Sequence, residues 1–314
     1  VDASKPSRWQ TFVYWTTNDE RYLDHDSERS PRAIDPWRLI PFVGLHLGCL
    51  AAFWTGISVF ALSLALLMYL ARMFVITAFY HRFFSHRAFD SSRIFRFIVA
   101  ILGCTAGQRG PLWWASHHRQ HHIYSDTESD PHSPQIDSLF FSHTLWFMTR
   151  DAFPVRWRHI KDLQTYRELI WLERFDWLPL LALAAGCFFL GEWTQVNYPH
   201  WQTSGWQSLV WGFFISTTAL YHATYTINSL AHRYGQRRFD TPDHSRNNVF
   251  LAILTLGEGW HNNHHRYPGA VRQGFYWWEV DVSYVGIKIL CLFGLVWNLR
   301  PVPSKILEAG RSKR

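Results

Sequence analysis

Apolar residues are gathered into a few long runs along this chain of 314 residues, with polar and charged segments between them. From Leu39 to Ala71 there is no Asp, Glu, Lys or Arg, and this run exceeds the roughly 20 residues that one membrane span needs. A break at Thr55-Gly56 divides it into an antiparallel pair of helices. Two further apolar runs follow. The pattern predicts an all-α integral membrane protein with four transmembrane helices, over about 39–55, 57–80, 177–191 and 206–231.

The two ends of the chain predict tails. Residues 1–38 are polar, mixed in charge and interrupted by three prolines, which indicates an irregular segment. They lack the basic start and apolar core of a signal peptide. Residues 301–314 form a basic tail, and between the tails we expect a single domain over 39–300.

The regions between and after the spans, 81–176 and 232–300, predict a helical cap on one side of the membrane. Within them, 87–110 and 284–299 mix apolar with basic residues, as helices lying on a membrane surface do. The cap and both tails hold essentially all of the Lys and Arg, whereas the loop over 192–205 holds none. Because basic segments stay on the cytosolic side, we expect both termini and the cap to face the cytosol.

Composition and charge limit the classes of partner that this protein is expected to bind. A net charge of +7 suits anionic lipid headgroups, phosphate-bearing substrates or an acidic protein partner, and no nucleic-acid motif occurs in the sequence. The 18 Trp residues suit the two membrane–water interfaces. Arg72 is the only charge inside the second predicted span, where it costs about 2.5–3.5 kcal/mol. The sequence leaves open whether this arginine serves function or packing.

Histidine is the residue whose pattern indicates chemistry. Eight of the 18 histidines fall into three motifs, HxxxxH at 81–86 and HxxHH at 118–122 and 261–265. On a helix, positions i, i+3 and i+4 share one face, so each HxxHH is half of a metal site. His232 follows Asn228 by four residues at the end of the fourth predicted span and adds a ninth histidine. The ligands we expect are His81, His86, His118, His121, His122, His232, His261, His264 and His265.

Nine histidines are too many for one metal ion and suit two, with four or five each. A nitrogen-rich site with few carboxylates favours redox-active iron over calcium or magnesium. Asn228 is a weak ligand, and we expect it to hold a metal-bound water. His117 lies outside the motif, and we expect it to be structural or to support a ligand. The acids that we expect to hydrogen-bond ligand imidazoles are Asp126, Glu128, Asp130, Asp240 and Glu258.

With these spacings the chain resembles the membrane fatty acyl desaturases of the stearoyl-CoA Δ9 type over about residues 40–300. The flanking segments agree: Gly257-Glu258-Gly259-Trp260, Asp130-Pro131-His132 and Phe140-Phe141-Ser142-His143. The segment Gly110-Pro111-Leu112-Trp113-Trp114 is similar to the bacterial branch. The resemblance implies a mushroom-shaped four-span protein, two iron ions, O2 as oxidant, a bent acyl tunnel and water held through Asn228. Zinc can replace iron in a purified sample.

The resemblance also implies that the enzyme introduces a cis double bond, at Δ9, into a saturated acyl chain, with acyl-CoA as the expected substrate. Animal members carry an Arg-Asp pair where this chain has Ser116 and His117, which keeps acyl lipid and acyl carrier protein open. The residues expected to bind the carrier are Arg150, Arg156, Arg158, Lys161, Gln108 and Trp114. The three arginines and the lysine in this set would bind phosphate groups.

We expect the acyl tunnel to run between the second and fourth spans. The resemblance places its end at Tyr69. Phe74 and Ala78 lie on or near the face of the same helix that carries His81, and we expect them to line the tunnel.

The implied reaction needs two electrons from outside, because no haem, flavin or iron–sulfur motif occurs in the sequence. We expect a donor of the ferredoxin, rubredoxin or cytochrome b5 kind, and a location in the bacterial inner membrane, or in the endoplasmic reticulum membrane of a eukaryote. A di-iron alkane or lipid hydroxylase and an alkene-forming fatty-acid decarboxylase are alternatives with similar histidine sites. A metal transporter is a non-enzymatic alternative, but it needs polar residues through the bilayer centre, and here the histidines gather at one face.

Overall fold

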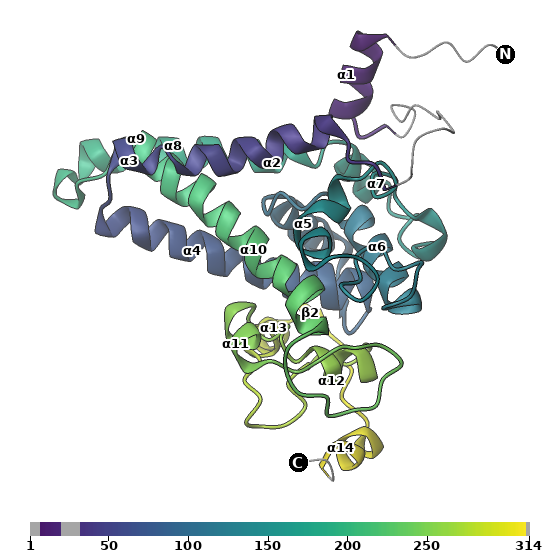
Figure 1. The fold of residues 1–314 in the computed structure, drawn as a ribbon. Helices are drawn as coiled ribbons and strands as arrows, with labels where there is room; N and C mark the ends of the chain where they lie inside the picture. The colour runs from purple at the N-terminus through teal and green to yellow at the C-terminus, as the bar shows by residue number, and fades with distance from the viewer. Residues whose placement is uncertain (1–6, 20–31, 312–314) are drawn as a thin grey trace.

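The structure is a computed structural model that describes residues 7–19 and 32–311. It is mostly helical, with two regions of different character. Long helices lie side by side at one end, and short helices joined by loops fill the other end (Figure 1). In the first half of the chain the elements are α1 (Arg8–Thr16), α2 (Pro36–Cys49), α3 (Ala52–Thr55), α4 (Val59–Val75), the π-helix η2 (Ile76–Ser85), β1 (Asp90–Ser91), α5 (Arg93–Cys104), α6 (Pro111–Tyr124), η3 (Phe141–Leu145), η4 (Trp146–Met148) and η5 (Trp157–His159).

The second half of the chain adds the remaining long helices and the C-terminal region. Its elements are α7 (Arg167–Arg174), α8 (Trp177–Asn197), η6 (Pro199–Trp201), α9 (Gly205–Leu209), η7 (Val210–Ile215), α10 (Ser216–Ser229), η8 (Leu230–His232), α11 (Val249–Leu254), α12 (His261–Arg266), α13 (Val282–Leu292), β2 (Val296–Trp297) and α14 (Ser304–Arg311). The two strands pair antiparallel and tie the segment before α5 to the segment after α13.

Three helical segments are long and apolar enough to cross a membrane: Pro36–Thr55, Val59–Ser85 and Trp177–Asn197. They confirm three of the predicted apolar helices and are longer than predicted. The first begins at Pro36 because Asp35 caps it, accepting a hydrogen bond from the backbone N–H of Trp37 at 3.1 Å. The break between the first two falls at Gly56, whose φ of 67° lies in the left-handed region that favours glycine.

The fourth predicted span is helical, but it is less apolar than the other three. Helical structure runs from α9 through η7 and α10 to η8, and packs against α4 and α8. It does not reach the length and hydropathy of the three spans above, so its crossing of a membrane stays a prediction. Several polar side chains on this segment face the interior of the bundle, among them Ser216 and Thr217.

The hydroxyl groups of Ser216 and Thr217 explain how Arg72 is accommodated inside the helix bundle. Its buried guanidinium donates to Ser216 Oγ at 2.5 Å and to Thr217 Oγ1 at 2.8 Å, and also to the carbonyl oxygens of Met68 and Thr105. A buried cation is tolerable when its donors are satisfied. Arg72 therefore ties α4 to α10 and to the end of α5.

The expectation of an irregular N-terminal tail is wrong for residues 8–16, which form α1. Ser7 and Gln10 make a reciprocal capping box, a local signal that the sequence contained. The helix is anchored to α8, since Trp177 Nε1 donates to the carbonyl oxygen of Thr16 at 2.6 Å. The rest of the predicted tail lies partly outside the described residues, in 1–6 and 20–31.

The described end of the chain, residues 304–311, is helical. In the predicted basic tail, α14 packs against the cap, where Tyr276 donates its hydroxyl to the carbonyl oxygen of Leu307 at 2.7 Å. The ring of Phe239 lies against Gly310 of the same helix. The two helices predicted over 87–110 and 284–299 are present as the shorter α5 and α13.

Candidate metal centre and adjoining cavity

A π-helix presents the first two histidines. In η2 the hydrogen bonds run from i+5 to i, and the N–H of His86 donates to the carbonyl oxygen of His81 at 3.2 Å. Residues five apart therefore come onto one side, and the two imidazole centroids lie 4.9 Å apart. On a regular α-helix they would diverge by about 140°. The HxxxxH spacing thus fits the local π-helical winding.

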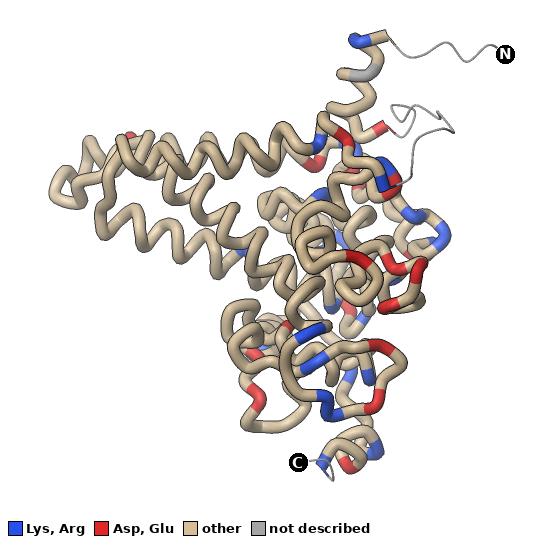
Figure 2. The backbone as a smooth tube through the Cα atoms, viewed as in Figure 1, with Lys and Arg blue, Asp and Glu red and all other residues tan. Residues whose placement is uncertain are grey.

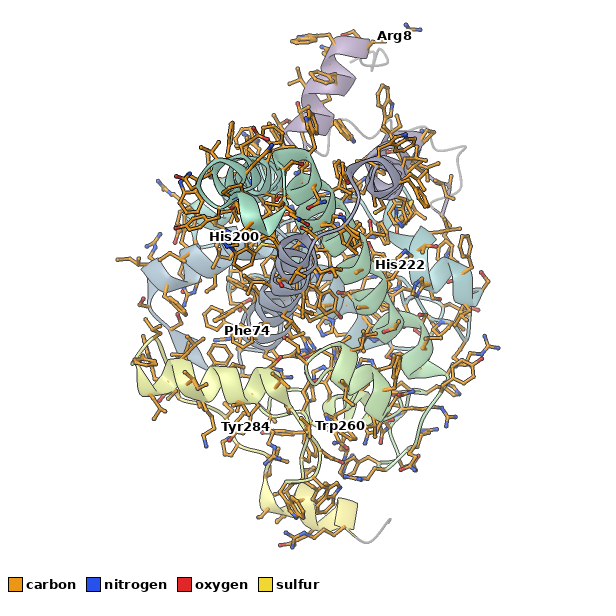
Figure 3. All side chains as sticks on the ribbon, turned by 90° about the vertical axis from the view of Figure 1, so that its left-hand side faces the viewer. Arg8, Phe74, His200, His222, Trp260 and Tyr284 are labelled. Atoms are coloured by element: carbon orange, nitrogen blue, oxygen red, sulfur yellow. The ribbon has the colours of Figure 1, made fainter. Side chains whose placement is uncertain are left out.

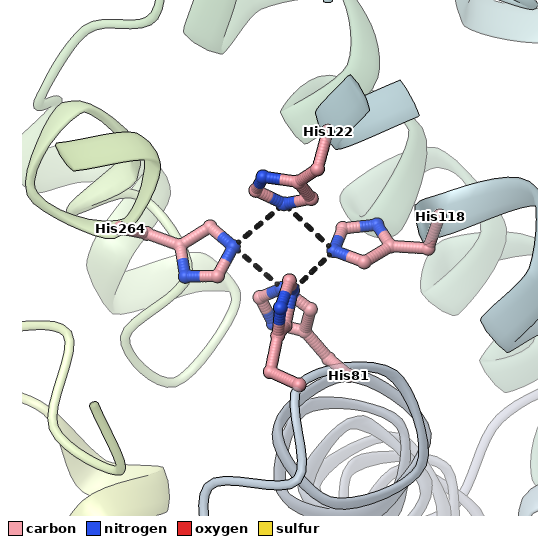
Figure 4. A group of neighbouring side chains, drawn as sticks. His81, His118, His122 and His264 are labelled. Carbon is pink, nitrogen blue, oxygen red and sulfur yellow. Dashed lines mark hydrogen bonds between the residues drawn. The ribbon is translucent and has the colours of Figure 1, made fainter. Parts of the chain in front are cut away.

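All nine predicted histidines come together, in two groups whose ligand atoms lie within 4.8 Å of one another. The first group is His81, His86, His118, His122 and His264, and the second is His121, His232, His261 and His265. Figure 4 shows four rings of the first group pointing at a common centre.

The three histidines of each HxxHH motif, which we expected on one face of a helix, divide between the two groups. In both motifs the i and i+4 histidines join one group and the i+3 histidine joins the other. Position i+4 lies about 40° from i around the helix, whereas i+3 lies about 60° away in the other direction. Since α6 and α12 meet across the centre, each helix contributes to both groups.

The Nε2 atoms within each group converge. Pairs of them approach to between 2.7 and 3.0 Å: His86–His118, His118–His122, His122–His264, His81–His264 and His232–His261. A neutral imidazole carries one N–H, so a ring whose Nδ1–H is already donated presents only a lone pair at Nε2. Lone pairs converging at this distance suit a cation between them.

Carboxylates fix that tautomer for four of the nine rings. Asp130 accepts from His121 Nδ1 at 3.0 Å, Asp126 from His232 Nδ1 at 2.9 Å, and Asp243 from His265 Nδ1 at 2.7 Å. Glu258 pairs with Nδ1 of His81. Burial opposes ionisation of Asp126, Asp130 and Asp243, but the bonded imidazoles hold the pKa of each carboxyl well below its ordinary value.

Three of the five predicted supporting acids therefore contact a histidine, and two do not. Asp240 has a side chain that is 92% exposed and faces Arg237 at 3.8 Å. Glu128 is exposed and offers its backbone carbonyl to Arg32. Asp243 was missed because it precedes its partner by 22 residues, in a loop with no regular spacing to α12. Gln273, also missed, lies 3.1 Å from His81 Nδ1.

The electrostatics favour neutral imidazoles. Burial, with help from neighbouring rings, lowers the pKa of His118, His122 and His264 well below its ordinary value. Burial also lowers the pKa of His265 to about 4 against the opposing effect of Asp243. The Nε2 atom of His265 is buried and has no hydrogen-bond partner among the described residues. Neutral rings with an available lone pair are the form that binds metal, so the donor set fits two metal ions.

A cavity of about 560 Å³ adjoins the first group. Its walls come from α1, α2, α6, α8 and α10, and His118 and Asn228 lie in its lining. Apolar side chains such as Leu45 and Leu180 dominate the end between α2 and α8. The size and lining suit an elongated apolar ligand.

The predicted substrate residues divide between this cavity and other places. Gln108 and Trp114 line it, and Gln108 Nε2 donates to Thr224 Oγ1 at 3.1 Å. The ring of Trp114 stacks on His118 with centroids 4.9 Å apart, and its Nε1 lies 3.5 Å from Gln108 Oε1, so both residues lie at the wall beside His118. His117, whose Nε2 lies 3.0 Å from the Pro154 carbonyl oxygen, also lines it.

The four predicted basic carrier residues do not line the cavity. Arg156 pairs with Asp151 at 2.7 Å, and the backbone N–H of Arg150 donates to Ala33. Arg158 and Lys161 are exposed. The cavity instead has two arginines that the sequence reasoning missed, Arg38 and Arg109.

The predicted tunnel end also lies apart from this cavity. Tyr69 donates its hydroxyl to the carbonyl oxygen of Leu254 at 2.7 Å. Phe74 lies against Gly286 of α13, the helix that carries Tyr284 (Figure 3). Ala78 is fully buried in the core. None of the three lines the cavity, which runs along α2 and α8 rather than between α4 and α10.

Comparison with known proteins agrees with this geometry. The family model described as fatty acid desaturase matches residues 52–281. An acyl-CoA 5-desaturase from Anemone leveillei is 37% identical, covering 87% of this chain and 81% of the relative. An sn-1 stearoyl-lipid 9-desaturase from Anabaena variabilis is 33% identical, covering 84% and 93%.

A third relative, a hex-5-enoyl-[acyl-carrier protein] acetylenase from Moorena producens, is 31% identical and covers 87% of each chain. The names of these three relatives contain three different acyl carriers. Two of them are named desaturases and one an acetylenase, and each match extends over most of this chain. The protein therefore belongs to the fatty acid desaturase family and is an oxidoreductase.

Proposed function

We propose that this protein is an O2-dependent acyl desaturase that introduces a cis double bond at Δ9 into a saturated chain. The observation that carries the proposal is the pair of histidine groups, five and four, beside an apolar cavity. The nine histidines would hold two iron ions, which supply the oxidising power needed to take hydrogen from an unactivated methylene. Zinc in the same sites would leave the enzyme inactive, because zinc has no redox chemistry.

The protein supplies position and tautomer. Asp126, Asp130 and Asp243 accept the Nδ1–H of their histidines and direct each Nε2 inward. Asn228 lies in the cavity lining and would hold a metal-bound water. The cavity would hold the acyl chain against His118 and Trp114, so that one C–C bond is selected by geometry.

Acyl-CoA is the proposed substrate, with Arg150, Arg156, Arg158 and Lys161 as phosphate-binding candidates. An acyl lipid is a second candidate, because the cavity is walled by α2 and α8, two of the three membrane-spanning candidates. In that case Arg38 and Arg109 would lie nearest the headgroup. We place the cap and both termini on the cytosolic side of four spans, in a bacterial inner membrane or an endoplasmic reticulum membrane.

Product analysis tests the reaction. Expression in a desaturase-deficient host should yield monounsaturated acyl chains, and mass spectrometry with double-bond mapping should place the bond at Δ9. Hydroxylated chains would indicate a hydroxylase, and terminal alkenes a decarboxylase. Separating CoA esters from lipid classes at short labelling times should show which pool becomes unsaturated first.

A further inference from the structure

The loop over 233–247, which joins η8 to α11, has one side at the metal centre and the other in solvent. Its inner side carries Asp243, which holds His265, and an antiparallel bridge between Gln236 and Asn247 closes its base. Its outer side carries exposed side chains, among them Arg233 and Arg237. Asp243 thus links this exposed loop to the four-histidine group.

His244 connects the two sides of this loop. Its side chain is 50% exposed, and its backbone N–H donates to Asp126 Oδ2 at 2.7 Å. Its Nδ1 lies 3.5 Å from the same oxygen. That oxygen also accepts from Nδ1 of His232, which belongs to the four-histidine group. One carboxylate therefore bridges an exposed imidazole and a buried candidate ligand.

The surface around His244 is basic. Arg233 and Arg237 of the loop and Arg266 of α12 are exposed, and Arg246 is half-buried, with Nη1 donating to the carbonyl oxygen of Gly235 at 3.2 Å. Asp240 is also exposed and lies 3.8 Å from Arg237, so it offsets part of this positive charge. Figure 2 shows the basic positions along this loop. Such a surface attracts an acidic partner and orients it before contact.

This surface is distinct from the cavity. No residue of the loop over 233–247 lines the cavity, and Arg266 does not either. A donor protein bound at this surface would leave the acyl chain in its cavity. The reaction requires this, because the acyl chain must stay at the centre while electrons arrive.

We propose that the loop over 233–247 and Arg266 form the docking surface for an acidic one-electron donor protein, with His244 and Asp126 as the route to His232. The inference rests on the proposed function, because that reaction needs two electrons from outside the protein. A saturated chain, O2, two protons and two reduced donor molecules give an unsaturated chain, two waters and two oxidised donors. The donor approaches at the four-histidine group, and the acyl chain lies at the five-histidine group.

Binding tests the surface without any turnover. The full chain in nanodiscs is titrated with an oxidised plant-type [2Fe–2S] ferredoxin and, separately, with the soluble haem domain of a cytochrome b5. We expect Arg233→Gln combined with Arg266→Gln to weaken the tighter of the two by about 10-fold at low ionic strength. The loss should shrink in 0.3 M salt, on the order of a few-fold, because rim charges are screened.

A matched control carries the same charge change elsewhere. Arg167→Gln combined with Arg174→Gln removes two exposed cations from α7 and should leave donor affinity unchanged. Equal weakening in both double variants, or none in the first, would overturn the proposal. A variant that loses binding to anionic vesicles while keeping donor affinity would assign the surface to lipid and also overturn it.

His244→Leu tests the route. At saturating donor, where any change in affinity no longer matters, it should slow donor-driven reduction of the centre by about 10-fold, whereas reduction by dithionite stays normal. An unchanged donor-driven rate would contradict the route. Single-turnover product from dithionite-reduced protein separates the docking surface from the proposed function. If this protein forms product but the donor-driven rate does not depend on these residues, the desaturase stands and the docking surface is removed. No product at all counts against the desaturase.

Discussion

At the scale of single residues, the bond behind each imidazole decides how well the ring binds metal. Asp243→Asn removes the charged acceptor of His265 Nδ1–H and should weaken metal binding at the four-histidine group by about 10- to 100-fold. Metal content after dialysis against graded chelator, measured by plasma mass spectrometry, checks this. Asp240→Asn, three residues away and exposed, is the matched control. Equal metal retention in the two variants would contradict the assignment of Asp243.

The histidines themselves make a second prediction at this scale. Replacing any one of His118, His121, His261 or His265 with Ala should abolish unsaturated product while the protein stays folded in detergent, because each group loses a donor that no neighbour can replace. Gas chromatography of acyl chains measures the product, and the elution profile in size-exclusion chromatography shows whether the protein stays folded. Near-normal turnover in two of these variants would exclude the two-metal assignment.

At the scale of elements, two positions are possible for the end of the acyl chain, one at α4 and one in the cavity along α2 and α8. If α4 closes the acyl tunnel, Tyr69→Ala or Phe74→Ala should accept longer chains, with the double bond still counted from the carboxyl end. Tyr69→Phe is the control, since it loses only the hydrogen bond to Leu254. Product chain lengths measured by mass spectrometry decide. A fixed chain preference with falling activity would show that these rings hold helices together.

The cavity along α2 and α8 makes the competing prediction. Leu180→Trp places a larger ring in the cavity wall and should shift the preference to chains shorter by about two carbons or more, if the acyl chain lies there. Competition between acyl substrates of different length measures the shift. Leu178→Trp, on the same helix but outside the cavity lining, provides the control. Identical preferences in the two variants would place the acyl chain elsewhere.

At the scale of the whole molecule, the buried imidazoles make metal-free stability depend on pH. Folded His265 has a pKa of about 4, against 6.5 for the ordinary group, so the unfolded chain binds more protons between these values. Stability of the metal-free protein should therefore fall as the pH is lowered from about 6.5 to about 4. Metal binding to the folded state should raise the unfolding midpoint.

Thermal unfolding in detergent at pH 7.5, 6 and 5, with and without chelator, provides the measurement. Metal-loaded protein at each pH is the control for effects of the detergent and of surface charge. A midpoint of the metal-free protein that stays level or rises toward pH 5 would show that the rings already carry protons in the folded state.

The sequence by itself determined the helical class, the three long apolar helices and which nine histidines come together. These depend on neighbours along the chain: an uncharged run long enough for a span, and histidines repeated at helical spacing. The contacts of Asp126, Asp130 and Glu258 were also foreseen, from the need of a ligand imidazole for an acceptor. The capping box at Ser7 was equally local, yet the prolines of the N-terminal segment hid the helix that it starts.

Only the tertiary structure decided how the histidines divide into five and four, that Asp243 rather than Asp240 supports His265, and that the cavity runs along α2 and α8. It also showed that Arg72 is satisfied by hydroxyl and carbonyl groups of α10 and α5. The physical reason is one of range. Periodicity and capping act between residues a few positions apart, whereas these contacts join residues up to 183 positions apart, and only packing of whole helices brings them together.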